Sequence, residues 1–368
     1  MKNRALLALA GLAIPLAVTV ADDDIDEIRA ILESQQDQIE LLKKNTSSST
    51  NQGVNIGGYG ELHYNKLSNK EDQIDFHRFV LFFSKDFSDK VHFFSEFELE
   101  HAIAGEGQTG EVELEQAYVD FNVTDNHNIR TGLFLVPVGI LNETHEPPTF
   151  YGTERNPVEK NIIPATWWEG GVGVNGQLMP GLSYDFNVTS GLNNDEYKIR
   201  SGRQKVGNAV AENFAYTGRV KWTSIPGLEL AATAQLQTNI TQGTDDDASA
   251  SLIEAHAIYN MDGFGLRALY AGWNVNGDGA KAKGRDEQNG YYIEPSYRVN
   301  QQLGVFARYN AWDNAAGDDA DSEYSQIDVG INYWPHEDVV LKVDYQDQTV
   351  PSDKTENDGV NLGFGYQF

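Results

Sequence analysis

The sequence predicts an all-β fold, a sixteen-stranded antiparallel transmembrane β-barrel with a short N-terminal coiled-coil helix. Three observations favour it: a two-residue alternation of apolar and polar side chains, connections that alternate in length, and an N-terminal segment typical of secreted proteins. The chain has 368 residues, a formal net charge of −28 and no cysteine. The missing cysteines exclude a disulfide framework and a thiol nucleophile, and the acidity argues against a nucleic-acid partner.

Residues 1–21 have the organisation of a secretory signal peptide. Lys2 and Arg4 precede an apolar run from Ala5 to Val20, after which the chain turns acidic at Asp22. A basic flank, a short apolar stretch and a small residue at the junction are typical of such peptides. The alternative, a membrane-anchoring helix, is disfavoured by the proline inside the run and by its shortness. We therefore expect the mature protein to leave the cytoplasm.

Residues 22–44 follow the three-and-four spacing of a heptad repeat, which predicts a short coiled-coil helix in the periplasm. The seam consists of Ile25, Ile28, Leu32, Gln35, Ile39 and Leu42. So short a helix is marginal alone, which favours self-association within an oligomer. An amphipathic helix packed on its own domain is the alternative. The polar residues 45–53 predict a flexible linker.

Residues 54–368 repeat the alternation of a strand that has one apolar and one polar face. The pattern is clear at 182–188, 228–237 and 339–346. Seven short connections rich in turn formers alternate with eight longer polar ones, so the chain has sixteen strands. The strands of a soluble β-sandwich would also alternate apolar and polar residues. The regular alternation of short and long connections, however, favours a closed barrel. The stretch 76–83 is apolar at both parities and its faces stay unassigned.

Several segments of this region carry a family resemblance. They are Gln116–Asp120, Arg130–Gly139 and a long connection with Phe150, Glu154–Arg155 and Pro164 that leads to Glu169–Gly171. They resemble Gram-negative outer-membrane porins, above all the phosphate-selective porins O and P and related general porins, over about residues 54–368. The resemblance implies a multi-pass barrel among the lipids of the cell outer membrane, a homotrimer, and a third outer loop folded inward. The final strand, which ends on Phe368, resembles the signal recognised by the barrel-assembly machinery.

The parity predicted to line the lumen carries seven basic and eleven acidic residues. The acidic excess predicts a weak preference for cations. Members of this lining that we expect at the pore are Glu96, Glu98, Arg130, Arg219, Lys221, Arg267 and Arg308. The phosphate channels of the resembled family rely on stacked arginines and a lysine row, and the predicted strands contain no equivalent cluster.

The long connection 140–168 is the candidate constriction, since loops of this length are usually functional. We expect its acids to face basic residues of the wall and to create a field across the pore. The acids are Glu143, Glu154 and Glu159, and the facing residues are Arg130, Arg219, Lys221 and Arg308. Arg155 and Lys160 of the same connection are also expected to lie at the constriction. The alternative is that Glu154 pairs with Arg155, and Glu159 with Lys160, inside the loop.

The sequence therefore predicts a water-filled channel for passive diffusion of small hydrophilic solutes and ions. An anion- or phosphate-selective channel and a periplasmically tethered structural protein are the alternatives. We expect no enzyme activity, no catalytic residue, no cofactor and no metal site. The acidic runs 245–247 and 318–321 are interpreted as solvated loops, with Ca²⁺ binding left open.

Overall fold

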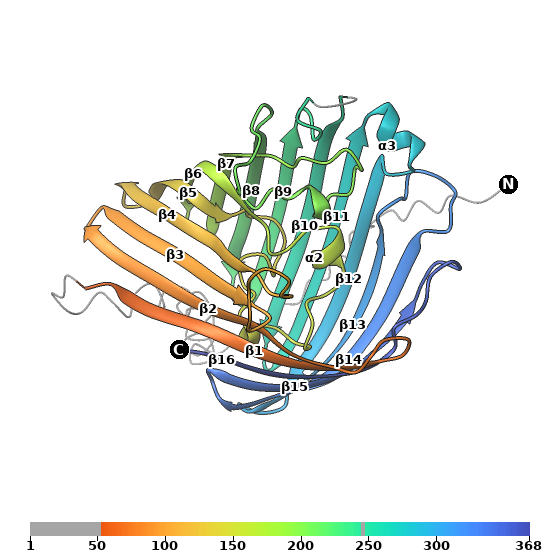
Figure 1. Ribbon diagram of the computed structural model, residues 1–368. Helices are drawn as coiled ribbons and strands as arrows, with labels where there is room; N and C mark the ends of the chain where they lie inside the picture. The colour runs from red at the N-terminus through yellow and green to blue at the C-terminus, as the bar shows by residue number, and fades with distance from the viewer. Residues whose placement is uncertain (1–52, 244–246) are drawn as a thin grey trace.

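Sixteen antiparallel strands close into one barrel in the computed structural model, which describes residues 53–243 and 247–368 (Figure 1). Every strand pairs with its neighbours in sequence, and β1 pairs with β16 to close the wall. The predicted all-β, sixteen-stranded barrel is confirmed. The signal peptide predicted for 1–21, the helix predicted for 22–44 and the linker predicted for 45–53, apart from Gly53, lie outside the described residues.

The strands are β1 (Asn55–Leu67), β2 (Gln73–Ser88), β3 (Val91–Glu100), β4 (Val112–Thr124), β5 (His127–Leu135), β6 (Trp168–Met179), β7 (Leu182–Thr189), β8 (Ala215–Ile225), β9 (Leu228–Gln237), β10 (Ser249–Met261), β11 (Phe264–Asn276), β12 (Glu287–Arg298), β13 (Leu303–Asp313), β14 (Glu323–His336), β15 (Val339–Thr349) and β16 (Gly359–Gln367). The short helices are η1 (Pro147–Thr149), α2 (Val158–Asn161), η2 (Arg200–Gly202) and α3 (Asp278–Ala282).

Short turns and long loops alternate around the barrel, as the sequence predicts, so each kind occupies its own rim. The turn expected near Pro335–His336 lies at Glu337–Asp338. A register shift between Tyr333 and His336 brackets Pro335. Because proline has no N–H to donate to a ladder, it is tolerated at such an irregularity, and β14 continues past it.

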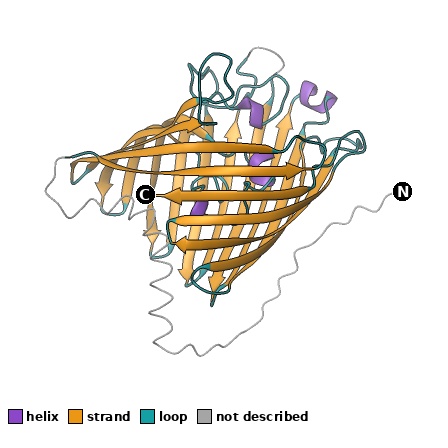
Figure 2. Cartoon of the chain, turned by 60° about the horizontal axis from the view of Figure 1, so that its bottom comes forward, coloured by secondary structure: helices purple, strands orange, loops and turns teal. Residues whose placement is uncertain are grey.

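The strands form the wall of the barrel (Figure 2), and the two faces of this wall differ in polarity. On β14, Val329, Ile331 and Tyr333 are exposed on the outside, whereas the alternating residues Asp328 and Asn332 are buried inside. This arrangement is typical of a barrel with a lipid-facing outer surface and a polar interior. In the described part of the chain, none of the helices is long and apolar enough to cross a membrane.

A β-bulge explains why the stretch 76–83 is apolar at both parities. Glu61 of β1 pairs with Arg78, whereas His63 pairs with Asp75, so β2 holds one extra residue there. The side chains of His77 and Arg78, although adjacent, both reach the interior. Beyond the bulge, Val80 and Phe82 are buried with Tyr59 in a small apolar cluster. The irregularity changes which parity points inward, and this change hides the alternation.

The loop between β5 and β6, residues 136–167, folds into the barrel, and we call it the inner loop (Figure 1). Its apolar side chains pack against the inner side of β10–β13. The loop contributes Val136, Val138, Ile140, Val158, Ile162, Ile163 and Trp167, and the wall contributes Leu252, Leu269, Trp273, Tyr292 and Trp312. The inward fold implied by the resemblance is therefore present. Because one side of the loop is fastened to β10–β13, its other side faces β1–β4.

We predict that Gly132→Ala destabilises the barrel. Gly132 has φ +129°, and a Cβ there would lie 2.3 Å from the carbonyl oxygen of Ala117 on the neighbouring strand. We expect the free energy of unfolding to fall by about 1–3 kcal/mol. Urea unfolding in detergent, followed by tryptophan fluorescence, measures it. The matched control is Gly218→Ala, since the nearest atom to a Cβ at Gly218 is 4.0 Å away; equal losses in both variants would contradict the prediction.

Candidate functional site

Basic residues of the wall hold the inner loop by its backbone. Arg267 donates from Nη2 to the carbonyl of Thr149 at 2.9 Å, and Lys342 donates from Nζ to the carbonyl of Gly152 at 2.8 Å. Arg308 pairs with Glu294 at 3.1 Å and Asp328 at 3.0 Å. The sequence predicts that Arg267 and Arg308 both lie at the pore. In the structure Arg267 fastens the inner loop, and Arg308 neutralises two nearby acids.

Glu159 lies inside the inner loop and is fully buried. Its Oε1 accepts hydrogen bonds from the backbone N–H groups of Ile140 and Leu141, both at 2.6 Å. Its Oε2 accepts from the hydroxyl of Tyr292 on β12 at 2.9 Å. One buried carboxylate therefore joins the start of the loop, its helix α2 and the wall. The sequence suggests that Glu159 faces basic residues of the wall or pairs with Lys160. The structure shows neither arrangement in the residues that it describes.

The remaining basic residues expected at the pore are paired across the strands. The register places Asp120 opposite Arg130, and Asp185 opposite Arg219. Arg130 Nε lies 2.8 Å from Asp120, and Arg219 Nη2 lies 2.8 Å from Asp185. The neighbouring Lys221 lies 3.8 Å from Glu229. Opposite charges in adjacent strands contribute to sheet stability, and here they cancel most of the basic charge of this wall.

Glu143 of the inner loop forms an ion pair with Arg219. Burial raises the pKa of Glu143, but Arg219, with Lys221 and Arg130 behind it, lowers that pKa to about 2. Glu143 therefore stays ionised at neutral pH. Of the three loop acids Glu143, Glu154 and Glu159, Glu143 is the one that pairs with a basic wall residue expected to face it, within the described part of the chain.

Glu154 of the inner loop lies beside β1. Its Oε1 is 3.1 Å from Nδ1 of His63 and 3.1 Å from Nδ2 of Asn65. Burial raises the pKa of Glu154, yet the hydrogen bond and charge of His63 hold it well below its usual range. Glu154 thus pairs with the wall, whereas the adjacent Arg155 turns to Thr166.

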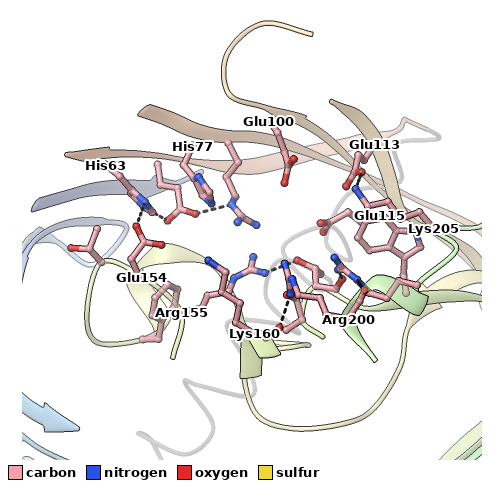
Figure 3. Close-up of a pocket in the computed structure, with 18 residues that line it drawn as sticks. His63, His77, Glu100, Glu113, Glu115, Glu154, Arg155, Lys160, Arg200 and Lys205 are labelled. Atoms are coloured by element: carbon pink, nitrogen blue, oxygen red, sulfur yellow. Dashed lines mark hydrogen bonds and ion pairs between the residues drawn. The ribbon is translucent and has the colours of Figure 1, made fainter. Parts of the chain in front are cut away.

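The space between the inner loop and β1–β4 is a pocket with two oppositely charged sides (Figure 3). The wall side carries Glu100, Glu113 and Glu115, which come from β3 and β4. The loop side carries basic residues that we call the cation patch: Arg155 and Lys160 of the inner loop, and Arg200 and Arg203 of the next loop, residues 190–214. In this structure the loop presents cations to an acidic wall.

The cation patch is held by uncharged groups. Arg155 Nη1 donates to the hydroxyl of Thr166 at 2.6 Å, and Arg200 Nη1 donates to the carbonyls of Lys160 at 2.8 Å and Ala165 at 2.9 Å. Arg203 donates to the carbonyl of Thr166. Within residues 53–243 and 247–368, none of the four forms an ion pair with a carboxylate. Burial, and then repulsion from Arg203 and Arg155, lower the pKa of Arg200, and the charge of Glu100 across the pocket offsets part of this shift.

Lys205 of the same loop crosses the gap to the wall, where it pairs with Glu111 at 2.7 Å and with Glu113. Sequence reasoning missed Arg200, Arg203 and Lys205 because it searched the strands and the 140–168 connection. A signal was present: residues 198–205 contain four basic side chains in eight positions of an otherwise acidic chain. Their approach to the inner loop could not be foreseen, because it depends on how two separate loops pack.

The comparisons with known proteins agree with this architecture. The family model described as phosphate-selective porin O and P matches residues 54–368. An uncharacterized protein of Aquifex aeolicus (strain VF5) is 32% identical over 370 residues, which cover 86% of this chain and 80% of that protein.

Two solved structures have similar folds at low sequence identity. The anion-selective porin from Comamonas acidovorans superposes with a TM-score of 0.62 at 14% identity, covering 86% of this chain and 99% of that one. The trimer form of in-vitro folded OmpT, an outer membrane protein of Vibrio cholerae, has a TM-score of 0.59 at 11% identity, covering 86% and 99%. At such identities, the likeness shows a shared barrel.

We predict that Glu143→Gln weakens the attachment of the inner loop in a pH-dependent way. At neutral pH the loss of the charged hydrogen bond to Arg219 should lower the free energy of unfolding by about 1 kcal/mol. The folded-state pKa of Glu143 is lowered to about 2 from an ordinary 4.5, so its contribution is complete above 4.5 and is lost as the pH falls through 2.

Urea midpoints at neutral pH and at several acidic values measure this contribution. The difference between wild type and Glu143→Gln should shrink steadily below the ordinary carboxyl pKa. Glu212→Gln, at an exposed position of loop 190–214, is the control. A difference that is independent of pH would show that the ion pair is not its cause.

Proposed function

Because the chain belongs to the family of phosphate-selective porins O and P, we propose that it forms a channel for passive diffusion of small hydrophilic solutes, with anions favoured at its constriction. The family and the β-barrel fold indicate an outer-membrane location. Porins are channels rather than enzymes, and the proposal assigns no catalytic step. What remains to be proposed is the kind of solute.

The observation that carries the anion preference is the cation patch. Its four basic groups lie on one side of the passage, and in the described part of the chain the three arginines donate only to carbonyl and hydroxyl oxygens. A passing oxyanion such as phosphate would supply the negative charge that they lack, and guanidinium groups bind such oxygens in pairs. Three cations of the wall, Arg130, Arg219 and Arg308, are in contrast already neutralised by aspartates of adjacent strands. The loop side is therefore the part of the lumen best suited to attract anions.

A weak cation preference, predicted from the sequence, is the second candidate. The observation that favours it is the acidic side of the same pocket, where Glu100, Glu113 and Glu115 face the passage. Acidic linings favour cations and basic linings favour anions. However, Lys205 pairs with Glu113 and occupies part of that side. The opposed sides also create a field across the passage that would orient dipolar solutes.

We predict that Arg200→Gln combined with Arg203→Gln reduces the anion preference of single channels. If the two groups stabilise a permeating anion by about 1 kcal/mol, the anion-to-cation permeability ratio should fall about fivefold. The reversal potential under a KCl gradient in planar bilayers measures this ratio, and added inorganic phosphate should reduce the chloride current of wild type more than that of the variant.

The matched control is Lys281→Gln combined with Lys354→Gln, which removes the same charge from exposed outer loops. It should leave the reversal potential nearly unchanged. Cation selectivity of the wild-type channel, without an effect of phosphate, would reject the anion proposal and favour the acidic side. Absence of any conductance would favour the structural, tethered protein.

We also propose that the chain forms a homotrimer. Its support is the Vibrio cholerae neighbour, which is described in a trimer form. The heptad spacing of residues 22–44 suits a coiled coil between subunits in the periplasm. We expect a chain that lacks residues 22–53 to form a trimer that dissociates at a lower temperature, measured by light scattering in detergent. Unchanged trimer stability would leave residues 22–44 with the tethering role.

A further inference from the structure

A cluster of buried ionisable groups lies where the first part of the inner loop meets β3 and β4. Nε2 of His145, from the loop, is 3.6 Å from Oε1 of Glu96 and 3.5 Å from Oε2 of Glu115. His145 is 3% exposed, and the two glutamates are each 1% exposed. These three atoms lie together in the interior, on the side of the loop opposite to β10–β13.

The facing atoms are close but poorly satisfied as hydrogen-bonding groups. Separations of 3.5 and 3.6 Å are at or beyond the limit of a hydrogen bond. Among the residues that the structure describes, Oε1 of Glu96, Oε2 of Glu115 and Nε2 of His145 are all buried without a hydrogen-bond partner, as are both carboxylate oxygens of the adjacent Glu98. Buried polar groups without partners are costly, so such a concentration of them calls for a ligand.

The surrounding groups orient these side chains. A register shift between Glu96 and Phe97 leaves β4 with one extra residue, so that both Glu115 and Gln116 are buried. Gln116 donates from Nε2 to the other oxygen of Glu96 at 2.6 Å. Nδ1 of His145 is 3.3 Å from the carbonyl oxygen of Asn142. With its proton on Nδ1, the imidazole presents the lone pair of Nε2 to the two carboxylates, as in histidines that ligate metals.

We propose that Glu96, Glu115 and His145 bind a divalent first-row metal ion that fastens the inner loop to the β3–β4 wall. Two ligand atoms that are each about 2.1 Å from a tetrahedral ion stand about 3.4 Å apart, close to the separations here. Two carboxylates and one imidazole suit ions such as Mn²⁺, Fe²⁺ or Zn²⁺. An ion would take up the three partnerless atoms in one step.

The charge of the neighbourhood also favours a cation. Glu98 lies beside the cluster, and the ion pair between its carboxylate and Nη1 of Arg78 is long, at 3.6 Å. Arg78 itself is held more closely by Glu61, at 2.7 Å. Arg155 is the other cation nearby, and it is directed to Thr166. Glu115 also lines the pocket between the loop and the wall, which gives an ion a way in from the lumen.

Two other groups offer internal comparisons. His336, Glu337 and Asp338 gather at an exposed short turn, where weak adventitious binding is expected. Asp75, His77 and His101 gather at the long-loop ends of β2 and β3, but there the imidazoles already have a partner, since Asp75 lies 3.0 Å from His77 and 2.8 Å from His101. The Glu96–Glu115–His145 cluster differs from both because it is buried and its facing atoms lack partners.

The experiment uses the full chain, refolded in detergent after treatment with EDTA and titrated with Mn²⁺. Electron paramagnetic resonance measures free Mn²⁺, and elemental analysis measures the bound metal. We expect one tightly bound ion per chain, competed by Zn²⁺. Glu115→Gln and His145→Gln should each weaken binding more than about tenfold, and Gln116→Ala, which alters only the orientation of Glu96, should weaken it by about tenfold.

The controls are His336→Gln and His101→Gln, which should leave the tight site intact. Heat-modifiable migration on gels identifies variants that fail to fold, and Gln116→Ala keeps the test decisive if a ligand variant does. Tight binding that persists in Glu115→Gln and His145→Gln, that is lost in either control, or that occurs only at millimolar metal would overturn the proposal. In that case a protonated His145 between two carboxylates would account for the cluster. The ion preference of the channel is measured separately, so the two proposals fail independently.

Discussion

The packing of the inner loop against the inside of β10–β13 is the contact on which the rest of the lumen depends. Apolar side chains of the loop, among them Ile162, Ile163 and Trp167, bury themselves against Trp273 and Tyr292 instead of water. Burial of apolar surface is the main stabilising term available to such a loop, and it decides which side of the loop meets the wall. The charged side is left facing β1–β4.

That packing would fail if the carbonyl and N–H groups of an irregular loop were left without partners inside the barrel. The wall meets this need with Arg267, Asn332 and Lys342, which donate to three carbonyls of the loop segment 149–152, and Glu159 accepts from N–H groups of the loop. Charged side chains of the lining therefore have two separate tasks. Those near the loop satisfy its backbone, and those that pair across strands neutralise one another.

The electrostatic character of the constriction is set by the charged residues that neither bind the loop backbone nor pair across strands. Cross-strand pairs such as Asp120 with Arg130 make one part of the wall nearly neutral. Beside the acids of β3 and β4 the neighbouring strand supplies Arg78, which pairs with Glu98, and further cations that face these acids come from two loops. Water in the space between the two sides would screen the repulsion between like charges on each of them. The same acidic excess extends inward to the buried Glu96 and Glu98, where the proposed metal ion would offset it.

The sequence by itself determined the barrel. Period-two alternation and the sorted lengths of the connections depend only on local order along the chain, so the sixteen strands and the long inner connection were predicted from residues alone. The exceptions are positions where local order is interrupted. The bulge at His77–Arg78 changes the parity that faces inward, and the one at Glu115–Gln116 places two adjacent side chains inside. No periodic pattern marks a one-residue insertion.

Only the tertiary structure decided how the charges of the lumen are used. Residue type suggested that Arg219 and Glu143 would be charged and inward, and in the structure they form an ion pair. It did not indicate that Arg308 would form ion pairs with Glu294 and Asp328. Nor did it indicate that Arg200 and Arg203 of another loop would lie beside Arg155 in the cation patch. Such outcomes depend on strand register and on the packing of segments far apart in sequence. The free energy of a buried charge is set by these neighbours, and the chain's linear order does not specify them.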